Sequence, residues 1–343
     1  MLIADILKEQ GYATACIGKW HLGHLPDFLP ARQGFDYYFG LPYSNDMWPK
    51  QPGRSNYPPL PLIENETTIE ENPDQSFLTK RYTEKCIEFI RKHQDRPFFV
   101  YLPHTMPHVP LFVTEKFKGK SAGGLYGDVI EEIDWGVGEI LKTVKELGLD
   151  ENTLVIFTSD NGPWLSKKAH GGSALPLRDG KFTTYEGGMR EPCIMRWPGK
   201  IPAGTVCKEL CATIDFLPTL AKLAGGKAPA DRVIDGKDVW PLLTGPSDAK
   251  TPHEAFYYYR GNTLEAIRVG NWKLRQVPVK VKKGQKQAKP KPPQPELYEL
   301  KQDVSEKNNL AAQHPEIVAK LTKMMKDFDQ QLKANTRPAG KVS

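Results

Sequence analysis

A repeated order of helix, apolar strand and polar loop is the feature that most constrains the fold of this 343-residue chain. Residues 76–93 and 126–147 carry apolar side chains at helical spacing. Each stretch is followed by a short apolar run, residues 97–102 (PFFVYL) and 153–158 (TLVIFT), which ends in a polar loop. This alternation predicts an α/β core with a largely parallel sheet, whose ligand sites lie at the carboxyl ends of the strands.

The remaining predicted elements divide the chain into two parts. Residues 2–10 are predicted to form a helix, and residues 27–61, rich in Pro, Gly and aromatic residues, a long ordered loop region. Toward the C-terminus four short strand-like segments occur without intervening helices, and residues 315–332 are predicted to form a closing helix. We therefore expect a larger domain over 1–250 and a smaller antiparallel sheet domain, packed with a helix, over 251–343.

Composition and charge narrow the class of protein. With 39% hydrophobic residues the chain can bury a large core, and it contains no apolar run of about 18 residues that would span a membrane. Six lysines within residues 277–295 account for the net charge of +6, so we expect no nucleic-acid partner. This Lys/Pro-rich stretch is predicted to be a solvated loop, with loose contact to a sulfated polysaccharide as the alternative. The five cysteines show no metal-type spacing.

Two histidine-containing clusters are candidates for chemistry. In the string GKWHLG, Lys19 and His21 are two residues apart, so an extended backbone would direct both side chains to one side. A cation beside a proton carrier suits an anionic ester, and two ordinary surface residues are the alternative. After the strand at 97–102, His108 lies between Pro107 and Pro110, which restrict its imidazole. A structural hydrogen-bonding histidine is the alternative there.

A third cluster, Asp160 and Asn161, provides two short oxygen ligands at the end of a buried strand. Hard cations such as Ca²⁺ and Mg²⁺ are commonly held by such ligands, and an Asx turn before Gly162 is the alternative. A fourth cluster is the glycine-punctuated segment 178–192, whose close backbone approach would let Lys181 meet a sulfate or phosphate. In the same segment Arg190-Glu191 is expected to be a structural ion pair.

Five strings resemble, in order and at family-like separations, the signatures of the formylglycine-dependent (type I) sulfatases of the arylsulfatase A group. They are GYATACIGKWHLG, QGFDYYFGLPYSND, PHTMPHVPL, LVIFTSDNGP and LRDGKFTTYEGGMREP. The later string LYELKQDVSEKNNLA also resembles a family sequence, so the resemblance covers nearly the whole chain. It implies an alkaline-phosphatase-like α/β fold: a mixed, mostly parallel sheet flanked by helices, with a smaller C-terminal antiparallel sheet domain.

The resemblance also implies a function, the hydrolysis of a sulfuric ester with calcium as cofactor. Residues 43–46 resemble the segment that lines the substrate mouth in arylsulfatase A relatives. The residues it assigns are Asp160 and Asn161 to calcium, Lys19, His108 and Lys181 to the sulfate oxygens, and His21 to proton transfer beside the nucleophile. The expected substrate is a small-molecule or carbohydrate sulfate ester.

The nucleophile of the family is a Cys or Ser in C/S-x-P-S-R or C/S-x-A-x-R, oxidised to formylglycine, whose hydrate attacks sulfur. No cysteine or serine of this chain lies in such a motif, and the family's paired aspartates and motif arginine have no counterpart. In the family all of these precede the helix that leads to GKWHLG. We therefore expect an N-terminally truncated sulfatase, with an incomplete calcium site, uncovered core surface and no activity by itself.

Two other functions are considered. One is a phosphodiesterase or phosphatase of the same superfamily, against which Asn161 counts because zinc-dependent members use His-rich ligand sets. The other is a non-catalytic protein that binds sulfate or sulfated glycans. Relatives are usually exported, whether periplasmic, secreted or lysosomal, whereas residues 1–10 do not read as a signal peptide. The sequence predicts neither the oligomeric state nor the particular sulfate ester.

Overall fold

A computed structural model of the chain describes residues 1–51, 53, 56–245, 248–276 and 294–338. Two compact units are present. The first comprises Met1–Val155, Met195–Cys207 and Ala212–Ala249, and the second Ile156–Ile194, Lys208–Cys211 and Lys250–Ser343. Most of the predicted Lys/Pro-rich loop, 277–293, lies outside the described residues.

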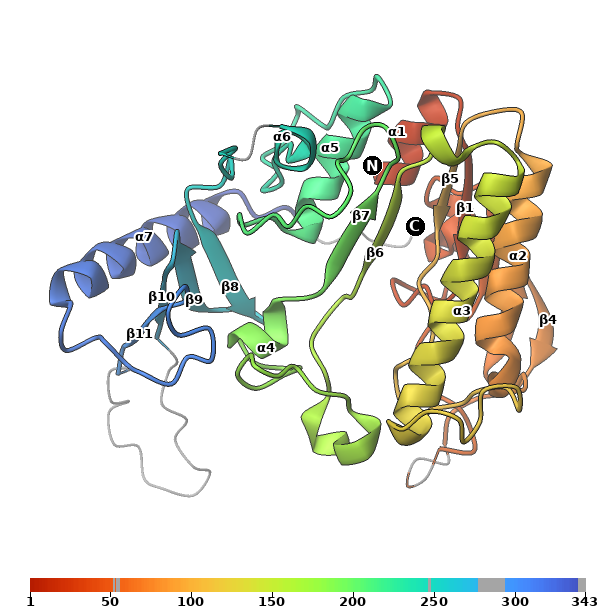
Figure 1. Ribbon diagram of the computed structural model, residues 1–343, viewed down its shortest axis with the longest axis horizontal. Coiled ribbons are helices and arrows are strands. Elements are labelled where there is room, and N and C mark those ends of the chain that lie inside the picture. Colours follow the sequence, from red (N-terminus) through yellow and green to blue (C-terminus); the bar gives the residue numbers. More distant parts are fainter. Residues whose placement is uncertain (52, 54–55, 246–247, 277–293, 339–343) are drawn as a thin grey trace. The chain divides into compact units, whose positions relative to one another are not determined.

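A five-stranded sheet forms the centre of the first unit (Figure 1). Its strands are β1 (Ala13–Ile17), β2 (Tyr37–Gly40), β3 (Pro61–Glu64), β4 (Thr67–Glu71) and β5 (Phe98–Tyr101), in the order β4-β3-β2-β1-β5. β1 pairs in parallel with β2 and β5, whereas β2–β3 and β3–β4 are antiparallel. The expected mixed sheet flanked by helices is confirmed, with half of its pairings antiparallel.

Strands β2, β3 and β4 of this sheet were not identified from the sequence. β2 lies inside 27–61, where the sequence predicted only a loop region, so that prediction is wrong at Tyr37–Gly40. β3 and β4 are joined through Asn65, which adopts φ 57°. Asparagine tolerates this left-handed conformation, so a tight turn forms between two short strands.

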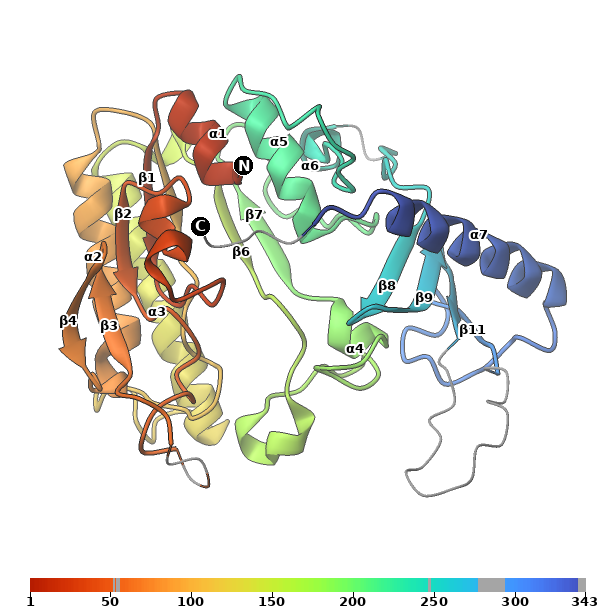
Figure 2. The same ribbon diagram turned by 180° about the vertical axis from the view of Figure 1, so that it is seen from behind.

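Helices cover this sheet, and the two opposite views in Figures 1 and 2 show α2 and α3 together on one face. α2 is Leu78–Lys92 and α3 is Gly124–Glu146, close to their predicted bounds. Because alternate residues of a strand point to opposite faces, Ala15 packs in the core with α2, while Cys16 packs in a second core with α1 (Ile3–Glu9). α1 also packs against α5 (Phe216–Leu223), and the short helix α6 (Trp240–Thr244) belongs to the same unit.

Two strands, β6 (Val155–Thr158) and β7 (Cys193–Arg196), pair with each other, and the chain passes from one unit to the other within each of them. β6 corresponds to the strand predicted at residues 153–158. Apolar side chains are exposed on β6, β7 and β5: Phe157 is 40%, Ile194 64% and Tyr101 45% exposed.

The second unit contains a four-stranded antiparallel sheet in the order β11-β10-β9-β8. Its strands are β8 (Phe256–Arg260), β9 (Thr263–Val269), β10 (Trp272–Arg275) and β11 (Glu296–Glu299). Helix α7 (Pro315–Ala334) packs on this sheet through Leu321 and Met325, as predicted. Within the described ranges no helix has both the length and the apolar character needed to cross a membrane.

Candidate functional site

The segment that carries Lys19 and His21 leaves β1 in the first unit and is held by backbone hydrogen bonds on both sides. Lys19 N donates to the Pro103 carbonyl at 2.7 Å, and His21 N donates to the Pro42 carbonyl at 3.0 Å. The chains approach so closely that a Cβ on Gly40 would lie 1.7 Å from the carbonyl oxygen of Gly18. Only glycine fits there. The backbone from which both side chains extend is therefore fixed.

The extended backbone assumed for this pair of residues does not continue to His21, which has φ 57°. Trp20, between them, is buried and donates its indole N–H to the Phe28 carbonyl at 2.8 Å. Lys19 is half-buried and His21 is exposed. The spacing argument for a shared direction is therefore wrong at His21, although both residues belong to one tightly held segment.

His108 lies in the loop after β5 and is oriented by its neighbours. Its Nδ1 lies 2.7 Å from the Val109 carbonyl oxygen, which can only accept, so Nδ1 carries the hydrogen of this bond. The hydroxyl oxygen of Ser44 lies 3.5 Å from the same Nδ1. Next to Ser44, the buried Asn45 donates to the Pro110 carbonyl at 3.1 Å. The 43–46 segment thus lies directly against the His108 loop, and Ser44 is a site candidate that sequence reasoning did not single out.

His104, the other histidine of this loop, has a different environment. Its Nδ1 is buried without a hydrogen-bond partner, and burial lowers the pKa of the imidazole to about 4. The ring lies near that of Tyr82, with centroids 6.4 Å apart. His104 is therefore neutral at physiological pH, which suits it less than His108 to the binding of an anion.

In the second unit the loop after β6 carries Asp160 and Asn161. The Asn161 amide donates to the Gly162 carbonyl at 3.0 Å. A Cβ on Gly162 would lie 1.9 Å from the Gly187 carbonyl oxygen, so this loop packs directly on the segment 178–192. Lys181 N donates to the Pro163 carbonyl at 2.9 Å, which joins the two loops a second time. The structure thus brings the predicted calcium ligands and the predicted sulfate-binding lysine onto adjoining loops.

Two aromatic rings lie beside the ammonium group of Lys181. The ammonium is 5.3 Å from the centroid of the Trp164 ring and 5.5 Å from that of Phe182. The two rings meet edge to face with centroids 5.6 Å apart. Cation–π contacts of this kind restrict where the lysine can point without neutralising its charge. Neither ring is an anion, so these contacts do not pair the Lys181 ammonium with a negative charge.

The expected ion pair between Arg190 and Glu191 is not what forms. The Arg190 guanidinium instead lies 4.0 Å from a carboxylate oxygen of Glu186, one helical turn earlier. The half-buried Glu191 has one carboxylate oxygen enclosed without a hydrogen-bond partner. Burial, together with the negative charge of Asp160, raises the pKa of Glu191 to about 7. Two carboxyl groups that repel each other in this way are what a cation would stabilise.

The oxygen donors at this place suit a hard cation by their chemistry. Ca²⁺ takes six to eight oxygen ligands. Within the described ranges no three His, Cys, Asp or Glu side chains are grouped closely enough to hold a metal ion. The donors that Asp160 and Asn161 supply therefore fit part of a calcium site, and further ligands are needed to complete it.

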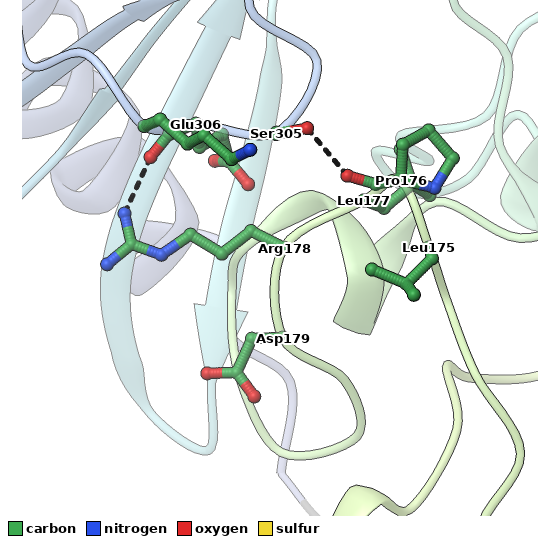
Figure 3. Close-up of a pocket in the computed structure, with 8 residues that line it drawn as sticks. Leu175, Pro176, Leu177, Arg178, Asp179, Ser305 and Glu306 are labelled. Atoms are coloured by element: carbon green, nitrogen blue, oxygen red, sulfur yellow. Dashed lines mark hydrogen bonds between the residues drawn. The ribbon is translucent and has the colours of Figure 1, made fainter.

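An open pocket of about 510 Å³ lies beside this region of the second unit, between residues 175–179 and 305–307 (Figure 3). Polar groups that line the pocket are hydrogen-bonded to one another. Arg178 donates to the Glu306 carbonyl at 2.7 Å, and Ser305 donates to the Pro176 carbonyl at 2.7 Å. These bonds fasten the start of the Lys181 segment to the loop that follows β11.

Known proteins resemble this chain over most of its length. The sulfatase family model matches residues 1–226, and the model of the N-sulphoglucosamine sulphohydrolase C-terminal region matches residues 178–333. N-acetylgalactosamine-6-sulfatase of Canis lupus familiaris is 42% identical over 281 residues, which cover 79% of this chain and 53% of that protein. Arylsulfatase A of Homo sapiens is 39% identical, with 79% and 57% covered. The chain thus spans about half the length of the curated relatives it matches.

A solved structure agrees with these relatives. The PsFucS1 sulfatase from Pseudoalteromonas sp. superposes with a TM-score of 0.87 at 27% identity, covering 98% of this chain and 74% of that one. The expected alkaline-phosphatase-like α/β fold is therefore confirmed, together with the resemblance read from the five sequence strings. The chain belongs to the sulfatase family.

Proposed function

We propose that the protein hydrolyses sulfuric esters, with Lys19, His108 and Lys181 as the residues that bind sulfate oxygens. The observation that carries this proposal is the setting of Lys181. Its charged ammonium is restricted by two aromatic rings, on a loop hydrogen-bonded to the loop of the oxygen donors Asp160 and Asn161. Membership of the sulfatase family supports the same assignment.

The roles follow from the charge that a sulfate ester carries. Cleavage of its sulfur–oxygen bond leaves the sulfuryl group on the attacking nucleophile, and the departing alcohol oxygen gains a proton. Ammonium groups at Lys19 and Lys181 stabilise the negative oxygens of that group. His108, oriented by the bond from Nδ1 to Val109, donates to a sulfate oxygen from Nε2 in the doubly protonated form of the ring. His21, exposed on its held segment, serves as the proton carrier.

Calcium belongs to the same proposal. Asp160 and Asn161 would hold the ion, and ligands other than these two residues would complete its coordination. A bound Ca²⁺ supplies positive charge to the sulfate oxygens. The residues of this chain contribute the rest: they bind and orient the ester.

The nucleophile is proposed to lie outside these 343 residues, because no cysteine or serine here is in the formylglycine motif. The 343-residue chain by itself is then a sulfate-binding protein without turnover. For the substrate class we propose a sulfated sugar, since relatives at about 40% identity are named for a sugar sulfate, N-acetylgalactosamine-6-sulfate. An exported location remains a prediction.

The test compares two esters in the protein read in frame from the codons upstream of Met1. We expect calcium-dependent release of 4-nitrocatechol from its sulfate, lost in the variant Lys181→Ala, and slower release of 4-nitrophenol from its phosphate. Faster turnover of the phosphate ester would instead favour the phosphatase alternative. Sulfate binding with no ester turnover in that extended protein would favour the non-catalytic alternative.

A further inference from the structure

One lysine and two glutamate side chains meet inside the second unit. Lys273, Glu186 and Glu306 are 0%, 1% and 0% exposed. The Lys273 ammonium lies 2.7 Å from a Glu186 oxygen and 3.0 Å from a Glu306 oxygen. Arg268, 3.8 Å from the other Glu186 oxygen, balances the second negative charge. Charges buried this deeply are tolerated only while each is paired, so removing one leaves the others uncompensated.

The three residues come from three separate parts of the unit. Lys273 lies on β10 and Glu306 in the loop after β11, whereas Glu186 is the first residue of α4 (Glu186–Met189), directly after Lys181's loop. The lysine therefore joins the C-terminal sheet to a segment far away in the sequence. Tyr258 of β8 completes the enclosure, with its ring 4.6 Å from the ammonium.

Glu306 holds both ends of one loop, residues 178–187, here named the 178–187 loop. Its carboxylate accepts the backbone N–H of Glu186 at 2.6 Å, and its carbonyl accepts the Arg178 guanidinium at 2.7 Å (Figure 3). The loop is closed on itself where Gly187 N donates to the Arg178 carbonyl at 2.8 Å. Lys181 lies within this closed loop. A shift at either end is therefore passed to the backbone that bears Lys181.

The charge balance shows what Lys273 does for this arrangement. Without its ammonium, Glu186 and Glu306 would face each other as two buried carboxylates, and the remaining cations Arg268 and Arg190 both lie on the Glu186 side. Like charges at this separation repel strongly in a region that excludes water, and the contact they would break is the one between α4 and the Glu306 loop. The 178–187 loop would then lose its attachment to the sheet.

We propose that Lys273 is a positioning residue, which holds the 178–187 loop in the form that presents Lys181 to a sulfate group. This inference rests on the proposed function. Lys273 is fully buried and acts only through the loop. Its removal changes anion binding without removing any group that touches the anion.

The test uses the 343-residue chain, inorganic sulfate as the probe, and Lys273→Met. Sulfate binding is measured by titration calorimetry at a temperature well below the midpoint of thermal unfolding. Circular dichroism checks that each variant is folded. Sulfate affinity is expected to fall about tenfold, the loss that follows when one charge-assisted hydrogen bond is misplaced. Amide hydrogen exchange in the 178–187 loop is expected to speed up while exchange in α7 is unchanged.

The matched control is Lys250→Met, which removes a lysine of the same unit that is 76% exposed and pairs with Glu209. It should change neither readout.

A second comparison applies if Lys273→Met does not fold. The double variant K273M/E306Q removes one charge of each sign, so two buried carboxylates no longer face each other. It is expected to fold and to bind sulfate as Glu306→Gln alone does, and an affinity about tenfold weaker in the double variant would overturn the charge-balance role. Unchanged sulfate binding in the folded lysine variant would overturn the positioning role and leave the proposed function standing. Wild-type chain that shows no Lys181-dependent sulfate binding would overturn both.

Discussion

His108 donates its Nδ1 hydrogen to the carbonyl oxygen of Val109 across 2.7 Å. This bond holds the orientation of the ring, and Nε2 can donate to an anion only when the ring is doubly protonated. The proposed function adds a second role for this imidazole, anion binding at Nε2, to the structural one at Nδ1. Substitutions that mimic one nitrogen at a time can therefore test them separately.

The variant His108→Asn keeps an amide donor near the position of Nδ1 and removes the atom at Nε2. We expect it to retain thermal stability and to lose sulfate affinity about fivefold to tenfold, the worth of one charge-assisted hydrogen bond. His108→Gln places an amide nearer to Nε2 and should lose less affinity. Calorimetric titration and thermal unfolding of both variants measure the difference, and equal affinities would contradict the assignment.

The contact between Gly18 and Gly40 predicts a large loss of stability on a small change. In Gly40→Ala the added carbon would lie 1.7 Å from the Gly18 carbonyl oxygen, so β2 and the segment bearing Lys19 must separate. We expect the free energy of unfolding to fall by about 3 kcal/mol or more, as for other overpacked cores. Urea unfolding measures it.

Gly138→Ala is the matched control for that substitution. Gly138 lies inside α3, and a Cβ there would have no atom within 4 Å. Alanine loses less conformational entropy than glycine on entering a helix, so stability should rise by about 0.5–1 kcal/mol. A fall in stability of the same size in both variants would show that the close approach is not the cause.

His104 predicts a pH dependence of stability. Burial lowers its pKa from 6.5 to about 4, so between these values the unfolded chain binds a proton that the folded chain does not. Stability should therefore fall as pH drops from 6.5 toward 4, by about 3 kcal/mol at most. His104→Phe should flatten this part of the profile of unfolding free energy against pH. An unchanged slope would contradict the assignment.

Glu132 on α3 gives a prediction of the opposite sign. Its buried carboxylate accepts hydrogen bonds from the hydroxyl and backbone N–H of Thr114, and burial nevertheless raises its pKa above 4.5. The folded chain thus binds more protons, so stability falls as pH rises through and above 4.5. Thr114→Val should cost about 1–3 kcal/mol at pH 7 and less at pH 4. Thr114→Ser, which keeps the hydroxyl, should cost little at either pH.

The long periodic elements could be predicted from the sequence because their signal is local. α2, α3 and α7 lie within a few residues of their expected bounds, and the four expected C-terminal strands are present as one sheet. β2, β3 and β4 could not be predicted in the same way. They have only four or five residues each, and their pairing depends on the turn at Asn65 and on β1 rather than on any alternation of their own.

The candidate site shows the same division between local and distant information. The segments bearing Lys19, His108, Asp160 and Lys181 were identified from short strings of sequence. Contacts between distant segments were not, and Ser44 beside His108 joins residues 64 positions apart. The Arg190–Glu191 prediction failed because Arg190 ends α4 in an extended conformation and its guanidinium lies near Glu186, four residues earlier. Glu191 instead interacts with the negative charge of Asp160, which raises its pKa, and no local sequence pattern predicts this interaction.

The central claim is that these residues hold a sulfate group, and titration of the 343-residue chain with inorganic sulfate tests it most directly. Wild type is compared with Lys181→Ala and with Lys167→Ala, which removes the neighbouring lysine whose ammonium also lies over the Trp164 ring. We predict sulfate binding in wild type and Lys167→Ala, and affinity at least about tenfold weaker in Lys181→Ala. No binding in wild type, or equal affinity in all three proteins, would contradict it.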